Sequence, residues 1–235
     1  GNQLTSVSEY DDNGDGNIDH RFSDTNTYDR RGNKLTSVSE SDDNADGTID
    51  DRYSNTNTYD QRGNQLTSVS ENDNDGDGTI DDRFSYTNTY DQRGNRLTDI
   101  SESDDNADGT IDSRYSTTNT YDRRGNLLTG ISESDDNGDG NIDSRYSTTN
   151  TYDQRGNLLT NVSETDNDGD GNIDSRYSNT NTYDQRGNQL TSISESDDNG
   201  DGNIDSRYSY TNTYDQSGNQ LTSVSEYDDN GDGNI

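Results

Sequence analysis

An acidic nine-residue segment recurs along the chain, and its first occurrence is DDNGDGNID, residues 11–19. The eight occurrences follow the pattern D-x-[DN]-x-D-G-x-I-D, the last of them ending at its isoleucine. Oxygen-bearing side chains at alternate positions can point at one centre, and the glycine at position six permits a sharp reversal of the backbone. Carboxylate and carbonyl oxygens are the ligands of hard cations. The segment, called the acidic loop below, therefore predicts a divalent cation site, with Ca²⁺ as the expected ion.

Five positions of each acidic loop are the expected ligands: the side chains at positions one, three, five and nine, and the backbone carbonyl at position seven. We expect about one Ca²⁺ per loop, with two as the alternative. In the third and sixth loops the residues at positions two and three exchange places, which keeps the carboxylate count constant. The expected metal residues are Asp11, Asn13, Asp15, Asn17, Asp19, Asp42, Asn44, Asp46, Thr48, Asp50, Asp73, Asp75, Asp77, Thr79, Asp81, Asp104, Asn106, Asp108, Thr110, Asp112, Asp135, Asn137, Asp139, Asn141, Asp143, Asp166, Asp168, Asp170, Asn172, Asp174, Asp197, Asn199, Asp201, Asn203, Asp205, Asp228, Asn230, Asp232 and Asn234.

The loop resembles the first nine positions of an EF-hand, but Phe22 stands where the EF-hand has its closing glutamate, and no helical sequence flanks it. It resembles more closely the thrombospondin type 3 loop, D-x-D-x-D-G-x-x-D, which occurs in extracellular proteins without flanking helices. Glu9 lies two residues before the first loop, and a glutamate holds that place in every copy. Three roles stay open for it: a further ligand, an ion pair with Arg21, or a solvated charge.

The elements that position these loops repeat every 31 residues, because the phrase GN-x-L-T returns at that spacing from Gly1 to Gly218. A fixed period of this size indicates a repeat architecture. We expect a single array over 1–235, and we expect this chain to be a segment of a longer one, because its end copies are not atypical. The copies, numbered one to eight, are 1–31, 32–62, 63–93, 94–124, 125–155, 156–186, 187–217 and the partial 218–235.

Each copy reads as two strands and two turns. QLTSVSE and IDHRFSDTNTYD are rich in β-formers and alternate with a period near two, placing Ile18, Phe22 and Tyr28 on one face and Arg21 and Ser23 on the other. YDRRGN is a tight-turn phrase, with an aspartate to open it and a glycine for positive φ. The expected fold is all-β, an antiparallel β-hairpin spiral or ribbon. The alternative is a parallel β-solenoid with one coil per repeat.

The turn phrase carries a second resemblance. TYDQRGNLLT, residues 151–160, is similar to the YD repeats of rearrangement-hotspot and teneurin-type proteins, whose core is Tyr-Asp-x-x-Gly-x-Leu. That resemblance implies a long spiral of antiparallel β-hairpins. Repeats of that family are shorter by roughly the length of the acidic loop, so the loop looks like an insertion at the far tip of each hairpin.

The composition makes the ion important for folding. Only 20% of the 235 residues are hydrophobic, and the formal net charge is −33, which is typical of disordered chains. The large apolar groups of one copy are Leu4, Val7, Ile18, Phe22 and Tyr28. We consider them too few to offset the ordering of 31 residues, and therefore expect the array to be disordered without calcium and β-structured with it.

The same charge argues against nucleic acid and anionic membrane surfaces as partners, and no apolar run is long enough for a membrane helix. There is no cysteine, and His20 is the only histidine and does not recur, so we expect no enzyme. The Phe22 and Tyr28 series are expected to pack as aromatic ladders. The expected function is a calcium-stabilised extracellular fibre, stalk or matrix filament, with neighbouring repeats or self-association as its contacts. The alternative is an adhesin or ligand-binding stalk, with glycans as partners.

Overall fold

The computed structural model describes residues 2–233, so Asn234 lies outside the described residues. Every regular element in this part of the chain is a β-strand, and most strands have nine residues. The residues 2–233 contain no helix that could cross a membrane. The strands are β1 (Thr5–Tyr10), β2 (His20–Tyr28), β3 (Lys34–Asp42), β4 (Asp51–Tyr59), β5 (Gln65–Asp73), β6 (Asp82–Tyr90), β7 (Arg96–Asp104), β8 (Ser113–Tyr121), β9 (Leu127–Asp135), β10 (Ser144–Tyr152), β11 (Leu158–Asp166), β12 (Ser175–Tyr183), β13 (Gln189–Asp197), β14 (Ser206–Tyr214) and β15 (Gln220–Asp228).

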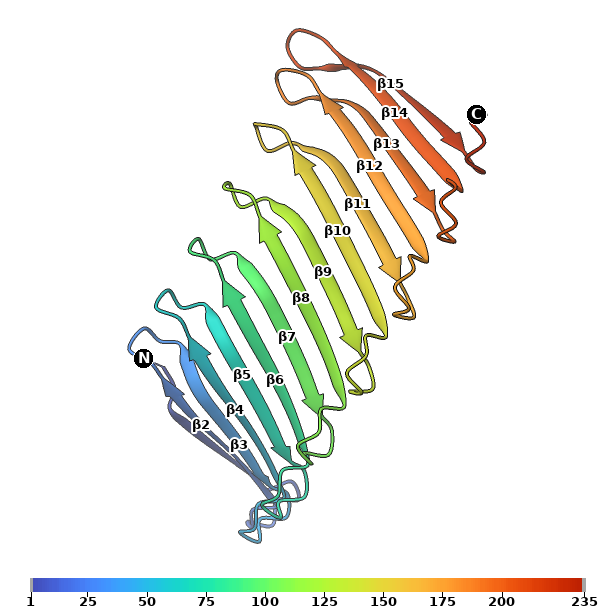
Figure 1. The fold of residues 1–235 in the computed structure, drawn as a ribbon. Helices are drawn as coiled ribbons and strands as arrows, with labels where there is room; N and C mark the ends of the chain where they lie inside the picture. The colour runs from blue at the N-terminus through green and yellow to red at the C-terminus, as the bar shows by residue number, and fades with distance from the viewer. Residues whose placement is uncertain (1, 234–235) are drawn as a thin grey trace. The chain divides into compact units, whose positions relative to one another are not determined.

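The chain divides into two compact units, one of residues 1–116 with 136–139 and one of 117–135 with 140–235. In the first unit β1 to β7 are hydrogen-bonded in chain order, and in the second β9 to β15 are (Figure 1). All of these pairings are antiparallel. The expected all-β array of antiparallel hairpins is therefore confirmed. The alternative of a parallel β-solenoid is wrong, because short turns at both ends of every strand reverse the chain direction each time.

Strand register gives each sheet two distinct faces. Across β12 and β13, Tyr177 lies opposite Ser196, while Arg176 lies opposite Asp197 and Thr180 opposite Ile193. Because side chains alternate between faces, the tyrosines and asparagines of each copy share one face, called the tyrosine face. The arginine, the threonines and the valine or isoleucine share the other, called the threonine face.

No hydrophobic side chain is buried among the described residues, so neither unit has an apolar core. The five large apolar groups of a copy do not share one face. Val7 lies opposite Ser23 on the threonine face and Phe22 opposite Ser8 on the tyrosine face, while Ile18 precedes β2 and lies in the acidic loop. The alternation of the strands thus divides the apolar residues between two faces that no second layer covers.

The YD phrase forms a tight turn around one carboxylate. The Asp60 carboxylate accepts hydrogen bonds from the backbone N–H groups of Arg62 and Asn64, and from the Asn64 side chain at 2.9 Å. Gly63 has φ +92°, a conformation that favours glycine. The Tyr59 hydroxyl donates to the Lys34 carbonyl, 3.1 Å away on the neighbouring strand. The aspartate, the asparagine and the glycine of the phrase therefore close the hairpin of β4 and β5, and the tyrosine ties it to β3.

Ring contacts among the described residues occur both within copies and between neighbouring copies. Phe84 meets Tyr86 edge to face with centroids 4.5 Å apart, and Tyr208 lies 6.3 Å from Tyr210. These partners are two residues apart on one strand and lie within one copy, whereas Tyr208 also lies 6.4 Å from Tyr227 of the next copy. The Tyr28 series is instead anchored through its hydroxyl groups, as Tyr183 is to the Leu158 carbonyl at 3.0 Å.

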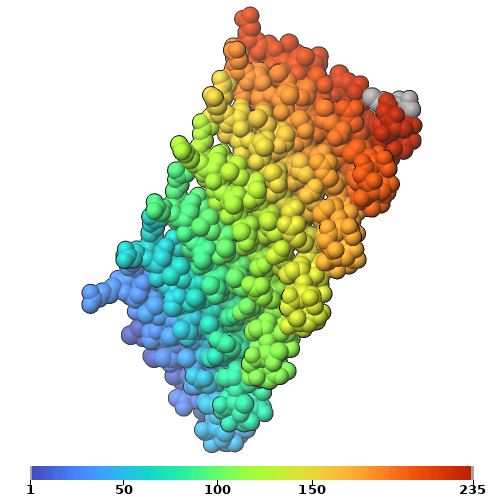
Figure 2. Space-filling view, viewed as in Figure 1, coloured from blue at the N-terminus to red at the C-terminus, as the bar shows by residue number. Residues whose placement is uncertain are grey.

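The acidic loops and the YD turns lie at opposite ends of the strands in each unit's sheet, and each of these two rows of strand ends is called an edge below. Odd-numbered strands run toward the acidic loops and even-numbered strands run toward the YD turns (Figure 1). In the space-filling view the acidic loops of each unit stand out as separate projections along one edge (Figure 2). Alternating short connections thus collect the acidic loops of a unit at one edge, as the insertion at the far hairpin tip predicts.

Candidate metal centre

The base of each acidic loop is closed by its ninth residue. In copy six the Asp174 amide donates to the Thr165 carbonyl at 2.8 Å, which continues the strand pairing by one step. The Asp174 carboxylate in turn accepts the backbone N–H of Asn167, at position two, at 2.7 Å. The same pair of bonds occurs in copy two, through Asp50. The ninth residue therefore fixes both ends of the loop and brings its carboxylate to the loop interior.

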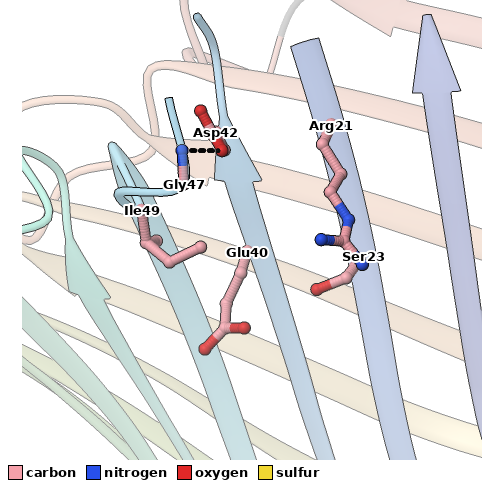
Figure 3. Close-up of a pocket in the computed structure, with 6 residues that line it drawn as sticks. All are labelled: Arg21, Ser23, Glu40, Asp42, Gly47 and Ile49. Carbon is pink, nitrogen blue, oxygen red and sulfur yellow. Dashed lines mark hydrogen bonds between the residues drawn. The ribbon is translucent and has the colours of Figure 1, made fainter. Parts of the chain in front are cut away.

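The first aspartate of the loop is its most buried charged group. Asp166, the last residue of β11, is only 4% exposed, and its Oδ2 accepts the backbone N–H of Gly171 at 2.9 Å. The equivalent bond between Gly47 and Asp42 is drawn in Figure 3. The other oxygen, Oδ1, is buried and has no hydrogen-bond partner in four copies. These four residues are Asp73, Asp135, Asp166 and Asp197.

The fifth and seventh residues form a local pair. The Asp170 carboxylate accepts the backbone N–H of Asn172 at 2.7 Å and its side-chain amide at 2.8 Å. These two bonds, the backbone one first, hold the pKa of Asp170 below its ordinary value. In copy two the backbone N–H of Thr48, followed by its side chain, lowers the pKa of Asp46 in the same way. In copies two and six, position seven thus orients the fifth carboxylate and favours its ionised form. The expected carbonyl ligand at that position stays a prediction.

Three carboxylates come together in two of the loops. In copy three, ligand atoms of Asp73, Asp75 and Asp77 lie within 4.8 Å of one another. In copy six the same holds for Asp166, Asp168 and Asp174. Oxygens that bind one Ca²⁺ at about 2.3–2.6 Å are separated by up to about 5 Å, so this spacing fits a shared ion. The unpartnered Oδ1 of the first aspartate supports the same reading, because a buried polar atom without a partner is costly.

Successive acidic loops of a unit pack directly on one another. A Cβ built on Gly169, at position four of copy six, would lie 1.7 Å from the carbonyl oxygen of Ile142 in the preceding loop. The same close approach joins Gly76 to Ile49 in the other unit. Only a glycine can make this contact, so position four determines how closely two loops stack.

Copies two and four carry alanine at position four, and their loops differ. Ala45 and Ala107 have φ of 52° and 50°, positive values that are uncommon for residues other than glycine. In copy four the backbone N–H of Asp108 donates to Asp104 Oδ1 at 3.1 Å, so that oxygen already has a partner. Copy two repeats this bond between Asp46 and Asp42. Within copies two to seven, the residue at position four therefore separates loops with a free buried oxygen from loops without one. In copies one and eight, which also have glycine there, the Oδ1 of the first aspartate accepts backbone amides.

In copies one to seven the glutamate before the loop forms an ion pair, which is one of its three expected roles. Glu164 Oε1 lies 3.4 Å from Arg176 Nε on the neighbouring strand. The distance in the other copies is 3.3–3.7 Å, from Glu9–Arg21 onward. Neither three-carboxylate group includes this glutamate. Its position on the threonine face, opposite arginine in register, explains the pairing.

The same arginine also faces the next acidic loop. Arg21 lies opposite Asp42 in register, and both line an open cavity of about 200 Å³ at the end of β3 (Figure 3). Glu40 lies on the same wall, two residues before Asp42. The arrangement recurs near the end of β15, where the lining residues are Arg207, Ser209, Glu226, Tyr227, Asp228 and Gly233. The arginine of one copy thus places its positive charge beside the first loop aspartate of the next copy.

Of the predicted ligand set, the structure brings together positions one, three and five in copy three and positions one, three and nine in copy six. The ligand role of the other predicted residues stays a prediction. Two features were missed by reasoning from the sequence. Position two supplies the amide that the ninth carboxylate binds, and position four sets the contact with the preceding loop. The alternation of glycine and alanine at position four, as in Gly76 and Ala107, was the available signal for the second.

No protein-family model matches the chain, and no curated protein matches it. Among solved structures it is similar to the crystal structure of TcdB2-TccC3-TEV, at 17% sequence identity and a TM-score of 0.37, over 95% of this chain and 13% of that one. It is also similar to a porin-like protein from Bacteroides uniformis, at 12% identity and a TM-score of 0.30, over 95% of this chain and 96% of that one. The chain thus spans a small part of the first structure. Because both TM-scores are below 0.5, the fold assignment rests on the strand pairing, which makes the chain a tandem β-repeat protein with recurring acidic clusters.

Proposed function

We propose that this chain is a calcium-stabilised structural repeat protein that serves outside the cell as part of a fibre, stalk or matrix filament. The observation that carries the proposal is the unpartnered, buried Oδ1 of Asp73 and of Asp166, each within a group of three carboxylates. A buried carboxylate oxygen without a hydrogen bond is costly. A bound cation would compensate it, in addition to the arginine that lies opposite the aspartate in register, Arg52 for Asp73 and Arg145 for Asp166.

Calcium is the ion that suits these groups best. The ligands are several carboxylate oxygens of one loop, which suit the variable coordination of Ca²⁺, whereas Mg²⁺ demands an octahedral arrangement and gives up its water reluctantly. Apart from the first aspartate, the loop residues are largely exposed, as Asp170 and Asn172 are. Exposed sites of this kind bind calcium at about 10⁻⁴–10⁻³ M in extracellular modules. Such an affinity suits the millimolar calcium outside cells and supports an extracellular location.

A structural role is supported by what holds the sheets together. The described residues bury no hydrophobic side chain, so hydrogen bonds, turns and ions must supply the stability. Acidic loops that touch, as Gly169 touches Ile142, bring many carboxylates together along one edge. A cation in each loop would relieve their repulsion and stiffen that edge. Kinship with YD repeats belongs to this proposal, supported by the turn phrase and the antiparallel hairpins.

Calcium titration of the full chain tests the proposal. We expect isothermal titration calorimetry to give about one Ca²⁺ per acidic loop, and circular dichroism to show β-structure that increases with calcium and is lost in EDTA. Mg²⁺ at the same concentration is the control and should give a much smaller change. An array that binds no calcium, or keeps its spectrum and melting temperature in EDTA, would refute the proposed function.

One observation favours a ligand-binding stalk as a second candidate. On the tyrosine face, Tyr146 and Tyr177 are nearly half exposed and line an open groove of about 320 Å³ with Ser163 and Ser196. Aromatic rings beside hydroxyl groups suit a sugar ring. Binding to a glycan array that is lost on Tyr177→Ala would support this candidate, and absence of glycan binding by the calcium-loaded chain would dismiss it.

A further inference from the structure

The order of the residues at positions two and three divides the acidic loops into two kinds. Six copies read Asp-Asn there, as at Asp198-Asn199, and copies three and six read Asn-Asp, as at Asn167-Asp168. The formal charge of the two orders is the same. The two positions point to different surroundings, however, so the exchange moves a carboxylate from one environment to another.

Position two faces the rim of the loop. In copy three the Asn74 side chain donates to Asp82 Oδ2, at the start of the outgoing strand, at 3.1 Å. In copy one the Asp12 carboxylate lies 3.6 Å from Nδ1 of His20, which holds the place equivalent to Asp82. A carboxylate at position two is therefore directed at the outgoing strand.

Position three faces the centre of the loop. Asp75 and Asp168 belong to the two groups of three carboxylates found among residues 2–233, and both groups also contain the first aspartate of their loop. In both copies Oδ1 of that aspartate, Asp73 or Asp166, is buried and has no hydrogen-bond partner. The Asn-Asp order thus adds a negative charge beside a buried oxygen that needs a cation. The Asp-Asn order places a neutral amide there.

We infer that copies three and six form a separate, tighter class of divalent cation site, filled at lower calcium concentration than the other loops. The inference rests on the proposed function and deepens it. Ligand charge count is a main determinant of calcium affinity in loops of this kind. One additional central carboxylate should lower the dissociation constant by about tenfold. Each of the two compact units contains one such loop, so low calcium would load one site in each unit first.

Exchange variants of the full chain test this inference without altering composition or charge. The loss variant carries N74D/D75N and N167D/D168N, and the gain variant carries D198N/N199D in copy seven. Copy seven was chosen for the gain variant because Oδ1 of Asp197, its first loop aspartate, is already buried and has no hydrogen-bond partner. Calorimetric titration with Ca²⁺ alone should show two tight sites in the parent chain, none in the loss variant and three in the gain variant. Circular dichroism at saturating calcium confirms that each variant folds.

The outcomes separate this inference from the proposed function. If all loops bind calcium with one affinity, or if the tight class stays at two sites in both variants, the inference fails and the proposed function stands. If the chain binds no calcium, both fail. Should the loss variant not fold, the gain variant still decides, because a tight class that stays at two sites would overturn the inference.

Discussion

At the scale of single residues, the first aspartate of the acidic loop has two carboxylate oxygens with different roles, and these roles are compatible only when a cation is bound. Its Oδ2 caps the turn through the position-six amide, as Asp166 does for Gly171, and this requires the carboxylate to sit inside the loop. Its Oδ1 then lies buried beside other carboxylates. The loop geometry is thus favourable when an ion is bound and strained by repulsion when none is.

Asp166→Asn should therefore affect the two states in opposite directions. The amide retains an oxygen for Gly171 and removes a charge that repels Asp168 and Asp174. A unit charge about 4–5 Å from another contributes about 1 kcal/mol even in a water-like medium. We expect circular dichroism to show that the variant keeps its β-structure down to a lower calcium concentration than the parent chain, while native mass spectrometry at moderate calcium counts one bound ion fewer.

Asp198→Asn is the matched control for that experiment. It removes the same charge in the same unit, but from the rim position of copy seven. The number of bound ions should stay unchanged in this variant. Equal loss of an ion in both variants would show that net charge, and not the central position of Asp166, controls binding.

Glu164→Gln tests the role of the glutamate before the loop. Its carboxylate pairs with Arg176 at 3.4 Å, and both side chains are more than a third exposed. Pairs of this kind contribute less than about 1 kcal/mol. We expect calcium affinity to stay within a factor of about two and the unfolding free energy to fall by less than about 1 kcal/mol. A large loss of affinity in calorimetry would make Glu164 a ligand.

At the scale of elements, strands and turns could be predicted because their signals are local. Period-two alternation gave the strands, and the YD phrase gave the turn in which Asp60 and Gly63 have defined roles. The burial of the two faces was harder to predict. Alternation indicates which residues share a face, but it does not indicate whether another layer covers that face. The packing of Gly76 on Ile49 joins residues 27 positions apart in different copies, and nothing in a single copy reveals it.

Gly169→Ala tests the contact between loops. The new Cβ would clash with the Ile142 carbonyl, so the loop should adopt the form seen at Ala107, in which the first aspartate's Oδ1 accepts an amide. We expect the chain to stay folded and the affinity of this loop to fall by about tenfold, because the free oxygen is lost. Calorimetry measures the change.

The reciprocal variant, Ala107→Gly, provides the control. It should allow the loop of copy four to approach the preceding loop and should release Asp104 Oδ1 from the Asp108 amide, which raises the affinity of that loop. If both variants change calcium binding in the same direction, position four does not act through the free oxygen.

The YD turn gives the stability a dependence on pH. Hydrogen bonds to Asp184, first from the Asn188 side chain, hold the pKa of its carboxyl below the ordinary value. A lowered pKa in the folded state adds stability above the unfolded-state value of about 3.9, and this stability is lost as the pH falls through the folded pKa. Asn188→Ala should therefore be less stable than the parent chain at pH 6, and the difference should shrink below about pH 4. Urea unfolding of both chains at several pH values measures it, and a difference that does not change with pH would exclude Asp184.

At the scale of the whole molecule, each unit is a sheet whose faces lack a covering layer and whose acidic loops gather at one edge. Such a sheet has little hydrophobic stabilisation, since no apolar side chain in residues 2–233 is buried. Its charge is concentrated where the loops touch. The balance between folded and unfolded states should consequently depend on cations more than on any single packing contact.

Two mechanisms could make that balance depend on cations, and one experiment separates them. If cations act only by screening a net charge of −33, then 1 M NaCl, with a Debye length of about 3 Å, should stabilise the chain as well as calcium does. If they bind in the loops, millimolar Ca²⁺ should raise the melting temperature well beyond the effect of 1 M NaCl, because coordination requires oxygens around one ion. We expect the second result from thermal unfolding in EDTA, in NaCl and in Ca²⁺. Equal stabilisation by NaCl would mean that the arrangement of the aspartates is irrelevant and that only their number counts.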